Sequence, residues 1–363
     1  MSVFPVSGRA LVASAAAVAL GVAPLATPGS AAAVDRPENR AEAFQSGEVR
    51  NYRIPSAFVA GADWGLTVDT IYMLAATGGR PVQVRRMGRV LANNAHKYTR
   101  VTFGDTTYRA AGATAKVLIA AKVVDRPARD YGGVDYRKRL SNFIVDRGPD
   151  AGRLSDNNSD GSDFSSTLTQ ALGVIAFSRS GGAPQRVVRH LLEQQCSNGG
   201  FTQAMTTGQT CAEAGGSPSV DSTAYAIQAM YAARKQGDAQ VRVQRIRRAV
   251  AWLLRAQRDN GSFGSDRSIP TANANSTGLA AQALADAGRD AAVRRARQFM
   301  TTLQVTRGDA GQARRVIGAI AYDRASLRAA RQDGTIDRDQ FRRATAQGAF
   351  AFAPKPLRTL STR

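Results

Sequence analysis

The sequence predicts an all-α fold in which about six inner and six outer helices alternate along the chain and close into a ring. The spacing Gln-x3-Gly-x-Phe occurs twice, at residues 195–201 and 257–263, each time after a stretch with helical apolar periodicity. Three alanine-rich segments share a Gln-Ala-(Leu/Met) core, at 166–172, 224–230 and 278–284. Strand patterning is scarce. Repeats of this length are typical of helical solenoids, in which each unit packs on its neighbours.

Amphipathic stretches predict the outer layer. Before Gln257, apolar residues recur at helical spacing between Val243 and Leu254, while the arginines of this stretch lie largely on the other side. The same pattern occupies residues 187–192 and 293–303. Each of these helices should therefore have one solvated face.

The alanine-rich segments predict the inner layer, because they carry few charges and should be buried on most sides. Extending their register gives the marker positions Tyr72, Lys116, Gln170, Gln228, Gln282 and Gln347. The weaker matches predict helices at 68–76, 113–124 and 344–353. The recurring glutamines indicate a shared packing role through buried amide hydrogen bonds. A row of ligand-binding amides that includes Gln228 and Gln282 is the alternative.

Residues 1–33 are typical of a secretory signal peptide, with a basic start, an apolar run at 10–26 and a small-x-small site at Ala31-Ala32-Ala33. Residues 34–353 should form the single ring domain, and residues 354–363 a flexible basic tail. No later stretch of about 18 apolar residues follows, so we expect no transmembrane segment in the mature chain. The protein should be secreted, and either released or held at the cell wall by charge.

The cysteines and the charge balance also fit an exported chain. Cys196 and Cys211 lie close together, which favours a disulfide over a reactive or metal-binding thiol. The net charge of +21 comes from 43 arginines and six lysines against 28 acidic residues. The arginines alternate with apolar positions instead of clustering with aromatic residues. We therefore expect no nucleic-acid partner, and a loose attraction to anionic cell-envelope polymers.

The Gln-x3-Gly-x-aromatic turns resemble the repeats of prenyltransferases and squalene cyclases, with Phe201 and Phe263 where tryptophan is often found. The resemblance is clearest from residue 163 to 304 and implies an α/α toroid of the terpenoid cyclase and protein prenyltransferase superfamily. The leader, Gln194-Gln195-Cys196 and residues 273–277 also resemble exported actinobacterial relatives whose biochemical role is poorly defined. Toroids of this kind include cyclases, transferases, cobalamin carriers and thioester-bearing immune proteins, so the resemblance does not select a function.

The catalytic runs of these families are missing from the sequence. An Asp-x-Asp-Asp run, which would supply a cyclase with its acid, is absent, and Asp163 and Asp221 are the nearest catalytic candidates. Aromatic residues make up only 7% of the chain, which is few for a cavity that stabilises cations. The zinc site of a prenyltransferase needs aspartate, cysteine and histidine, but no cysteine follows Asp221 closely and the chain has only two histidines. The thioester run is absent too.

Asp163, Asp221 and Asn275 each stand seven residues before an inner-helix glutamine. Two interpretations are open for them. The sequences Asp221-Ser-Thr and Asn275-Ser-Thr are typical helix N-caps, in which a side-chain oxygen accepts from a free backbone N–H. Alternatively, the three side chains line one mouth of the ring, where a ligand would meet them together.

One loop resembles the first half of a calcium-binding loop, with Asp156, Asn158 and Asp160 at alternating positions before Gly161. Position 12 of that loop is a threonine instead of a bidentate glutamate, which removes two ligand oxygens. A solvated polar loop is therefore the alternative to a weak calcium site. No other cofactor is expected.

Together these features predict an exported, non-catalytic toroid that binds a small apolar ligand or an anionic cell-envelope polymer. An isoprenoid cyclase or a prenyltransferase-related enzyme is the first alternative. A corrinoid carrier is the second, although the β-rich domain of toroidal cobalamin binders has no counterpart in this sequence. An aromatic-lined interior with a buried, unpaired aspartate would favour the enzyme, and a narrow alanine-lined interior would favour binding or scaffolding.

Overall fold

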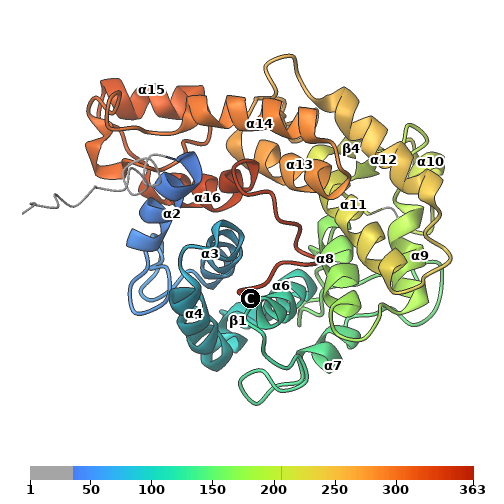
Figure 1. Cartoon of the computed structure of the whole chain (residues 1–363). Coiled ribbons are helices and arrows are strands. Elements are labelled where there is room, and N and C mark those ends of the chain that lie inside the picture. Colours follow the sequence, from blue (N-terminus) through green and yellow to red (C-terminus); the bar gives the residue numbers. More distant parts are fainter. Residues whose placement is uncertain (1–35, 206) are drawn as a thin grey trace, which may run out of the picture.

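The computed structural model describes residues 36–205 and 207–363, which form an α/α toroid (Figure 1). Each inner helix packs on the next, and the last packs back on the first, so the ring is closed. The inner helices are α3 (Trp64–Thr77), α6 (Ala111–Val123), α8 (Thr167–Ser178), α11 (Val220–Lys235), α13 (Ala274–Asp286) and α16 (Arg338–Gly348). The predicted signal peptide lies outside the described residues.

An outer layer surrounds this ring, and each of its helices packs on at least one inner helix. The outer helices are α2 (Pro37–Gly47), α4 (Pro81–Asn94), α7 (Tyr136–Ser141), α9 (Gln185–Glu193), α12 (Val243–Ala256) and α14 (Asp290–Leu303). Six inner and six outer helices therefore confirm the prediction for the described part of the chain. Within that part, no helix is both long and apolar enough to cross a lipid bilayer.

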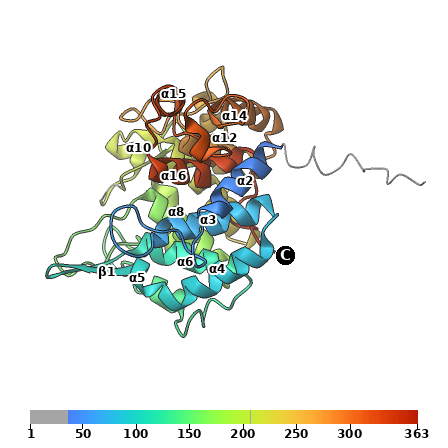
Figure 2. The same ribbon diagram turned by 90° about the vertical axis from the view of Figure 1, so that its left-hand side faces the viewer.

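Short elements connect the two layers. They are the helices α5 (His96–Thr99), α10 (Cys211–Ala214) and α15 (Arg324–Gln332), the 3-10 turns η1 (Ala313–Val316) and η2 (Ala349–Ala351), and the strands β1 (Arg100–Phe103), β2 (Thr106–Arg109), β3 (Phe201–Thr202) and β4 (Pro218–Ser219). The strands form two antiparallel pairs, β1 with β2 and β3 with β4. Because an outer helix returns the chain after each inner helix, the amino ends of the inner helices gather at one end of the ring. Figure 2 shows β1 projecting on the opposite side from the C-terminus.

All six marker positions lie in inner helices. The alanines and glycines of these helices allow close approach, since a Cβ on Gly278 would lie only 2.1 Å from the Gln347 carbonyl oxygen of α16. The boundary of the last inner helix differs from the predicted range 344–353. It begins at Arg338 because the Asp337 carboxylate caps it, accepting from the Gln340 N–H.

The two Gln-x3-Gly-x-Phe turns join neighbouring repeats. The Gln195 amide donates to the carbonyl oxygens of Gly199 (3.0 Å) and Arg245 (2.9 Å), and the Gln257 amide makes the equivalent pair of bonds. Gly261 has a φ of +85°, and a Cβ there would lie 2.2 Å from a carbonyl oxygen of α14. Glycine is therefore required at this turn.

A third turn of this kind is hidden by an insertion. The Gln304 amide donates to Gly318 (3.1 Å) and to Pro37 (2.9 Å), although this glycine follows fourteen residues later instead of four. The buried Ile320 N–H then donates to the Thr345 hydroxyl (2.9 Å), as the N–H groups of the two turn phenylalanines donate to threonines of α11 and α13. The turn thus recurs where the sequence spacing does not show it.

Gln170, Gln228 and Gln282 are fully buried and bonded through their amides, as the predicted packing role requires, although their partners differ. Gln170 accepts from the Leu154 N–H and donates to the carbonyl oxygens of Gly152 (2.9 Å) and of Val187 in α9 (2.8 Å). Gln228 instead donates to Gln282 (3.0 Å). The predicted marker Gln347 lies three positions too early in the repeat. Thr345 is equivalent to Thr223, since each hydroxyl accepts from a turn N–H. Gln228 follows Thr223 by five residues, so the equivalent position after Thr345 is residue 350.

Part of the positive charge is structural. Arg248 and Arg255, on the face of α12 expected to be solvated, donate to the carbonyl oxygens of Ser197 (2.7 Å) and Asn198 (3.1 Å). These carbonyls lie in the turn after α9, where a cation also interacts favourably with the helix dipole. The arginines therefore join neighbouring outer helices as well as contributing charge.

The segment 354–363, expected to be a flexible basic tail, is instead packed against the ring. Leu357 and Leu360 are each 1% exposed and belong to the main core. The Leu357 N–H donates to Gln228 (2.8 Å), and the Thr362 N–H donates to Val123, the last residue of α6 (3.0 Å). Two buried leucines three residues apart anchor this segment, which crosses the centre of the ring over the carboxyl ends of the inner helices (Figure 1).

Candidate functional site

Polar side chains from α3, α5, α6 and α11 meet inside the ring, in a group that we name the axial cluster: Asp69, Tyr72, Tyr98, Lys116 and Tyr225. The Lys116 Nζ lies 2.5 Å from the Asp69 Oδ1. The Tyr72 hydroxyl donates to the Lys116 carbonyl oxygen (2.6 Å). The side chains of Lys116 and Asp69 remain 18% and 20% exposed, so the ion pair lies within the ring without being completely buried.

The electrostatic surroundings keep Lys116 charged. Burial alone would lower the pKa of this lysine, but the attraction of Asp69 and the influence of Tyr98 and Tyr225 outweigh it. The pKa of Lys116 is therefore raised above its ordinary value. The ammonium group and the Asp69 carboxylate form a pair that is neutral overall.

The three tyrosines of the cluster stay protonated. Burial is the main reason why the pKa values of Tyr72, Tyr98 and Tyr225 are raised, and the Asp69 carboxylate raises them further. Lys116 lowers the pKa of Tyr98 and Tyr225 only in part. The cluster thus offers phenol hydroxyls, which both donate and accept hydrogen bonds, around an ion pair.

Asp221 lies in the first turn of α11, but it is not the cap of that helix, so the N-cap interpretation is wrong for it. The cap is Ser219, whose hydroxyl accepts from the Ser222 N–H (3.3 Å). The Asp221 Oδ2 accepts from the Ser265 hydroxyl (2.9 Å), while its Oδ1 is buried without a hydrogen bond from the described residues. Burial raises the pKa of Asp221, and the nearby hydroxyls of Ser276 and Ser265 lower it only in part.

Asn275 occupies the equivalent position at the start of α13, and the cap interpretation is wrong for it as well. The cap is Asn273, which accepts from the Ser276 N–H (2.9 Å). The Asn275 Oδ1 is buried and has no hydrogen-bond partner among the described residues. Asp221 and Asn275 therefore lie at the same end of neighbouring inner helices with unused oxygen atoms, and the charge of Asp221 also acts on Tyr225.

Asp163 has a different role. Its Oδ2 lies 2.8 Å from Arg153, and its Oδ1 accepts from the backbone N–H groups of Asp156 (3.0 Å) and Ser165 (2.9 Å). Burial raises the pKa of this carboxyl, but these N–H groups and nearby hydroxyls outweigh it, so the pKa is lowered. Asp163 therefore organises the loop before α8.

The predicted calcium-loop residues bond to the protein itself. The Oδ1 atoms of Asp156 and Asn158 accept from the backbone N–H groups of Ala111 and Arg109, each at 2.8 Å, and Asp160 accepts from Ser162 (3.0 Å). Among the described residues, no group of three histidine, cysteine or acidic side chains is placed to hold a metal ion. The loop is thereby tied to the start of α6. The calcium site stays a prediction, which titration calorimetry with calcium would test.

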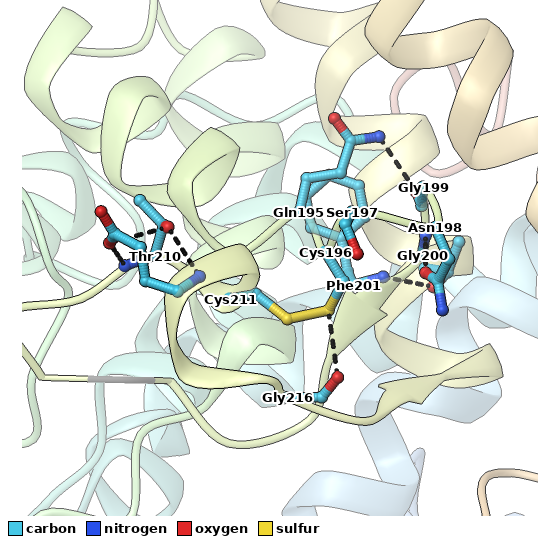
Figure 3. Close-up of a disulfide and its surroundings, with 12 residues drawn as sticks. Gln195, Cys196, Ser197, Asn198, Gly199, Gly200, Phe201, Thr210, Cys211 and Gly216 are labelled. Atoms are coloured by element: carbon cyan, nitrogen blue, oxygen red, sulfur yellow. Dashed lines mark hydrogen bonds between the residues drawn. A yellow bond between two sulfur atoms is a disulfide. The ribbon is translucent and has the colours of Figure 1, made fainter.

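Gln228 and Gln282, predicted as ligand-binding candidates, lie on the side of the C-terminal segment. Gln282 donates to the Lys355 carbonyl oxygen (2.7 Å), and Gln228 accepts from Leu357. Both amides are fully buried and bonded there. The predicted disulfide between Cys196 and Cys211 is confirmed (Figure 3).

Sequence reasoning missed Asp69, Tyr98 and Tyr225, and assigned Lys116 only a place in the repeat register. One signal was available for the ion pair. Asp69 and Lys116 are isolated charges inside otherwise apolar helical stretches, and a charge in such a place is either paired or functional.

No family model matches the chain, and no curated protein matches it. Solved structures resemble it over most of its length. A protein geranylgeranyltransferase-I of Candida albicans complexed with GGPP aligns with a TM-score of 0.56 and 9% identity, covering 89% of this chain and 95% of that one. The type II terpene cyclase MstE from Scytonema gives 0.55 and 16%, with coverage of 88% and 97%. Cellobiose 2-epimerase from Bacillus thermoamylovorans gives 0.57 and 11%, with coverage of 87% and 98%. These similarities show the α/α-toroid fold.

Proposed function

We propose that this chain is an exported, non-catalytic toroid that binds a small, hydroxyl-rich ligand at the cell envelope through the axial cluster. One observation carries the proposal: protonated phenols surround a partly exposed Asp69–Lys116 ion pair inside the ring. Hydroxyl groups of a ligand can accept from the ammonium group and the phenols, and can donate to the carboxylate.

The ion pair favours a polar ligand over the small apolar ligand expected from the sequence. An apolar molecule placed against Lys116 and Asp69 would remove water from both charges without replacing its hydrogen bonds, which is unfavourable. A polyhydroxylated molecule such as a glycan fragment would replace those bonds. The tyrosine rings would add apolar contact to its C–H groups.

Two further features support the cell envelope as the place of action. A disulfide is typical of proteins in an oxidising compartment. The net charge of +21 favours attraction to anionic polymers. The outer arginine-rich helices would then hold the protein near such polymers while the ring binds the small ligand.

The test is native mass spectrometry of the full chain purified gently from its own culture medium. We expect a retained polar molecule that the variant Tyr225→Phe loses, because this change removes one hydroxyl from the cluster. Tyr131→Phe is the matched control, since that hydroxyl donates to the Gly88 carbonyl oxygen (2.6 Å), away from the cluster. A retained lipid, isoprenoid or corrinoid would overturn the proposal, and so would a clean apo mass.

A second candidate is an enzyme related to isoprenoid cyclases or prenyltransferases, which one observation favours. Asp221 is a mostly buried carboxyl with a raised pKa and an unpaired oxygen, which suits a proton donor. The test is to incubate the protein with a linear isoprenoid diphosphate and an epoxidised linear isoprenoid. An enzyme would convert one of these compounds, and Asp221→Asn would abolish the conversion. Unchanged substrate in both samples would exclude this candidate for these compounds.

A further inference from the structure

A pocket of about 440 Å³ lies outside the axial cluster, between the disulfide-bonded loop and the turn that follows α12. Its walls include Trp252, Arg258, Arg267 and the segment 215–217. This volume falls within the range of small-molecule sites, which are commonly a few hundred cubic ångströms. Neither the sequence repeats nor the axial cluster accounts for this combination of one aromatic ring and two cations.

Trp252 supplies a fixed aromatic surface. It projects from the outer helix α12, is partly exposed and packs against the core. A Cβ on Gly200 would lie 2.7 Å from the indole ring and 2.6 Å from Pro218. The absence of a side chain at position 200 therefore leaves room for the indole beside the backbone. The indole ring therefore both packs against the core and borders the pocket.

The polar lining is positively charged. Arg258 is held at the rim by donating to the Pro270 carbonyl oxygen, and Arg267 is exposed with no hydrogen-bond or ion-pair partner among the described residues. Asp266 also lines the pocket, and its carboxylate, whose Oδ1 accepts from the backbone N–H groups of Ser268 (2.8 Å) and Ile269 (3.0 Å), offsets one of the two guanidinium charges, so the lining keeps a net positive charge. An anion would thus find a free guanidinium beside an aromatic ring.

The disulfide supports the opposite wall. Cys211 is bonded to Cys196, and Gly216 lies so close that a Cβ there would be 2.8 Å from the Cys211 sulfur (Figure 3). The Gly216 N–H also donates to the Cys211 carbonyl oxygen (3.3 Å). The disulfide and this backbone bond thus both lie directly beside residues 215–217.

We propose that this pocket binds an anionic saccharide, namely a pyranose that carries a carboxylate. The C–H face of the ring would stack on the electron-rich face of Trp252, and the carboxylate would bind Arg267. The proposal does not rest on the proposed function of the axial cluster, because none of the axial residues lines this pocket. The pocket does adjoin Asp221, since Ser265 lines the pocket and its hydroxyl donates to that carboxylate.

The chain has two tryptophans, so the variant Trp64→Phe leaves Trp252 as the only one. Its fluorescence is followed during titration with sodium glucuronate and, separately, with glucose as the neutral match. We expect a saturable change that requires less glucuronate than glucose. Arg267→Gln, in the same background, should weaken glucuronate binding about tenfold or more, because it removes a charge-assisted hydrogen bond, and leave glucose binding unchanged. Arg267 is exposed, so this change should not disturb folding.

Three further measurements locate the site. Trp252→Leu, followed by calorimetry with wild type as reference, should remove the part of glucuronate binding that Arg267→Gln weakens. Replacing both cysteines by serine should weaken both sugars alike, because the wall at 215–217 loses its anchor. Tyr225→Phe should leave glucuronate affinity unchanged. The proposal is overturned by the absence of any saturable response to glucuronate, by equal glucuronate affinity in Arg267→Gln, or by loss of binding in Tyr225→Phe alone.

Discussion

The two ends of the ring are built from the same six inner helices but differ in how their polar groups are satisfied. At the carboxyl ends, Arg179 donates to the carbonyl oxygens of Leu357 and Leu360, and Arg358 donates to both carboxylate oxygens of Asp286. At the amino ends, Asp221 and Asn275 each keep a buried oxygen without a hydrogen-bond partner among the described residues. One end is closed by the chain itself, although the Ser178 hydroxyl at the end of α8 is also buried without a partner among the described residues. The other end retains two unused oxygen atoms, from Asp221 and Asn275.

The difference between the two ends indicates that one end stabilises the ring and the other is available to a ligand. A buried polar atom without a partner costs about 1–3 kcal/mol, so a fold selected only for stability would satisfy or replace it. Such costs are typical of sites that meet a ligand. The carboxyl end therefore acts as the structural closure of the ring, and the amino end is where we place the ligand.

The largest expected effect comes from the C-terminal segment. Leu357→Ala and Leu360→Ala should each lower the free energy of unfolding by about 2–5 kcal/mol, because both side chains are almost fully buried in the core. Thr359→Ala, at an exposed position between them, is the control and should change stability by less than about 0.5 kcal/mol. Urea unfolding measures all three variants. Equal stabilities would contradict the structural role of the segment.

The ion pairs at the two ends give the next test. Arg358→Met leaves Asp286, which is 1% exposed, as a buried charge without its partner, and should cost about 3–5 kcal/mol at neutral pH. Burial raises the pKa of Asp286 even with Arg358 present, so the penalty should shrink as pH falls and disappear only well below about 4, the ordinary aspartate pKa, where the carboxyl is neutral in both states.

Lys116→Met should cost less, about 1–3 kcal/mol, because Asp69 keeps contact with water. The same variant should lose the ligand of the axial cluster, whereas Arg358→Met should keep it. A larger stability loss for Lys116→Met than for Arg358→Met would reverse the assignment of the two ends. Both values come from urea unfolding combined with native mass spectrometry.

The ring was predictable because its information is local and repeated. Helical periodicity and the Gln-x3-Gly-x-Phe spacing place one element at a time, and closure follows from their number. The prediction was incomplete where spacing changed. The insertion between Gln304 and Gly318 hides a third turn, and residues 354–363 carry too short a pattern to reveal that Leu357 and Leu360 are buried.

The axial cluster was not predictable in the same way. Asp69, Tyr98 and Lys116 come from three separate helices, and nothing in their spacing indicates that they meet. Equivalent positions of a repeat share one end of the ring, and the structure places Asp221 and Asn275 there, at the start of α11 and α13. That they meet a ligand at this mouth stays a prediction. The hydrogen bonds of Asp163 all come from its neighbours in the loop before α8.

A smaller expected effect is a difference between Asp221 and Asp163 in how each side chain changes the free energy of unfolding with pH. Burial raises the pKa of Asp221 above its unfolded value, so its ionisation destabilises the fold as pH rises through the interval between the two values. Asp221→Asn should therefore raise the free energy of unfolding at pH 7, on the order of 1 kcal/mol, with little gain well below about pH 4, where the carboxyl is protonated in both states.

Asp163→Asn should do the opposite. The pKa of Asp163 is lowered in the folded chain, so the carboxylate contributes stability above its unfolded pKa and loses it as pH falls. The variant should be less stable than wild type at pH 7 and equal to it in acid. Thermal unfolding across this pH range measures both effects. A loss of stability for Asp221→Asn at pH 7 would show that its carboxylate is structural.

The smallest effect concerns the arginines that support the amino end. Arg248→Ala and Arg255→Ala each remove a hydrogen bond to a carbonyl oxygen of the turn after α9. Each should lower the free energy of unfolding by about 0.3–1 kcal/mol. The loss should be smaller in high salt, because salt screens the interaction with the helix dipole. Arg247→Ala, which removes the same charge from α12 without such a bond among the described residues, is the matched control and should cost less. Because the amino end is held by several weak bonds of this kind instead of one packed segment, no single arginine change there should approach the loss caused by Leu357→Ala. Equal costs for all three arginine variants would mean that only charge, and not the turn contacts, matters at this end.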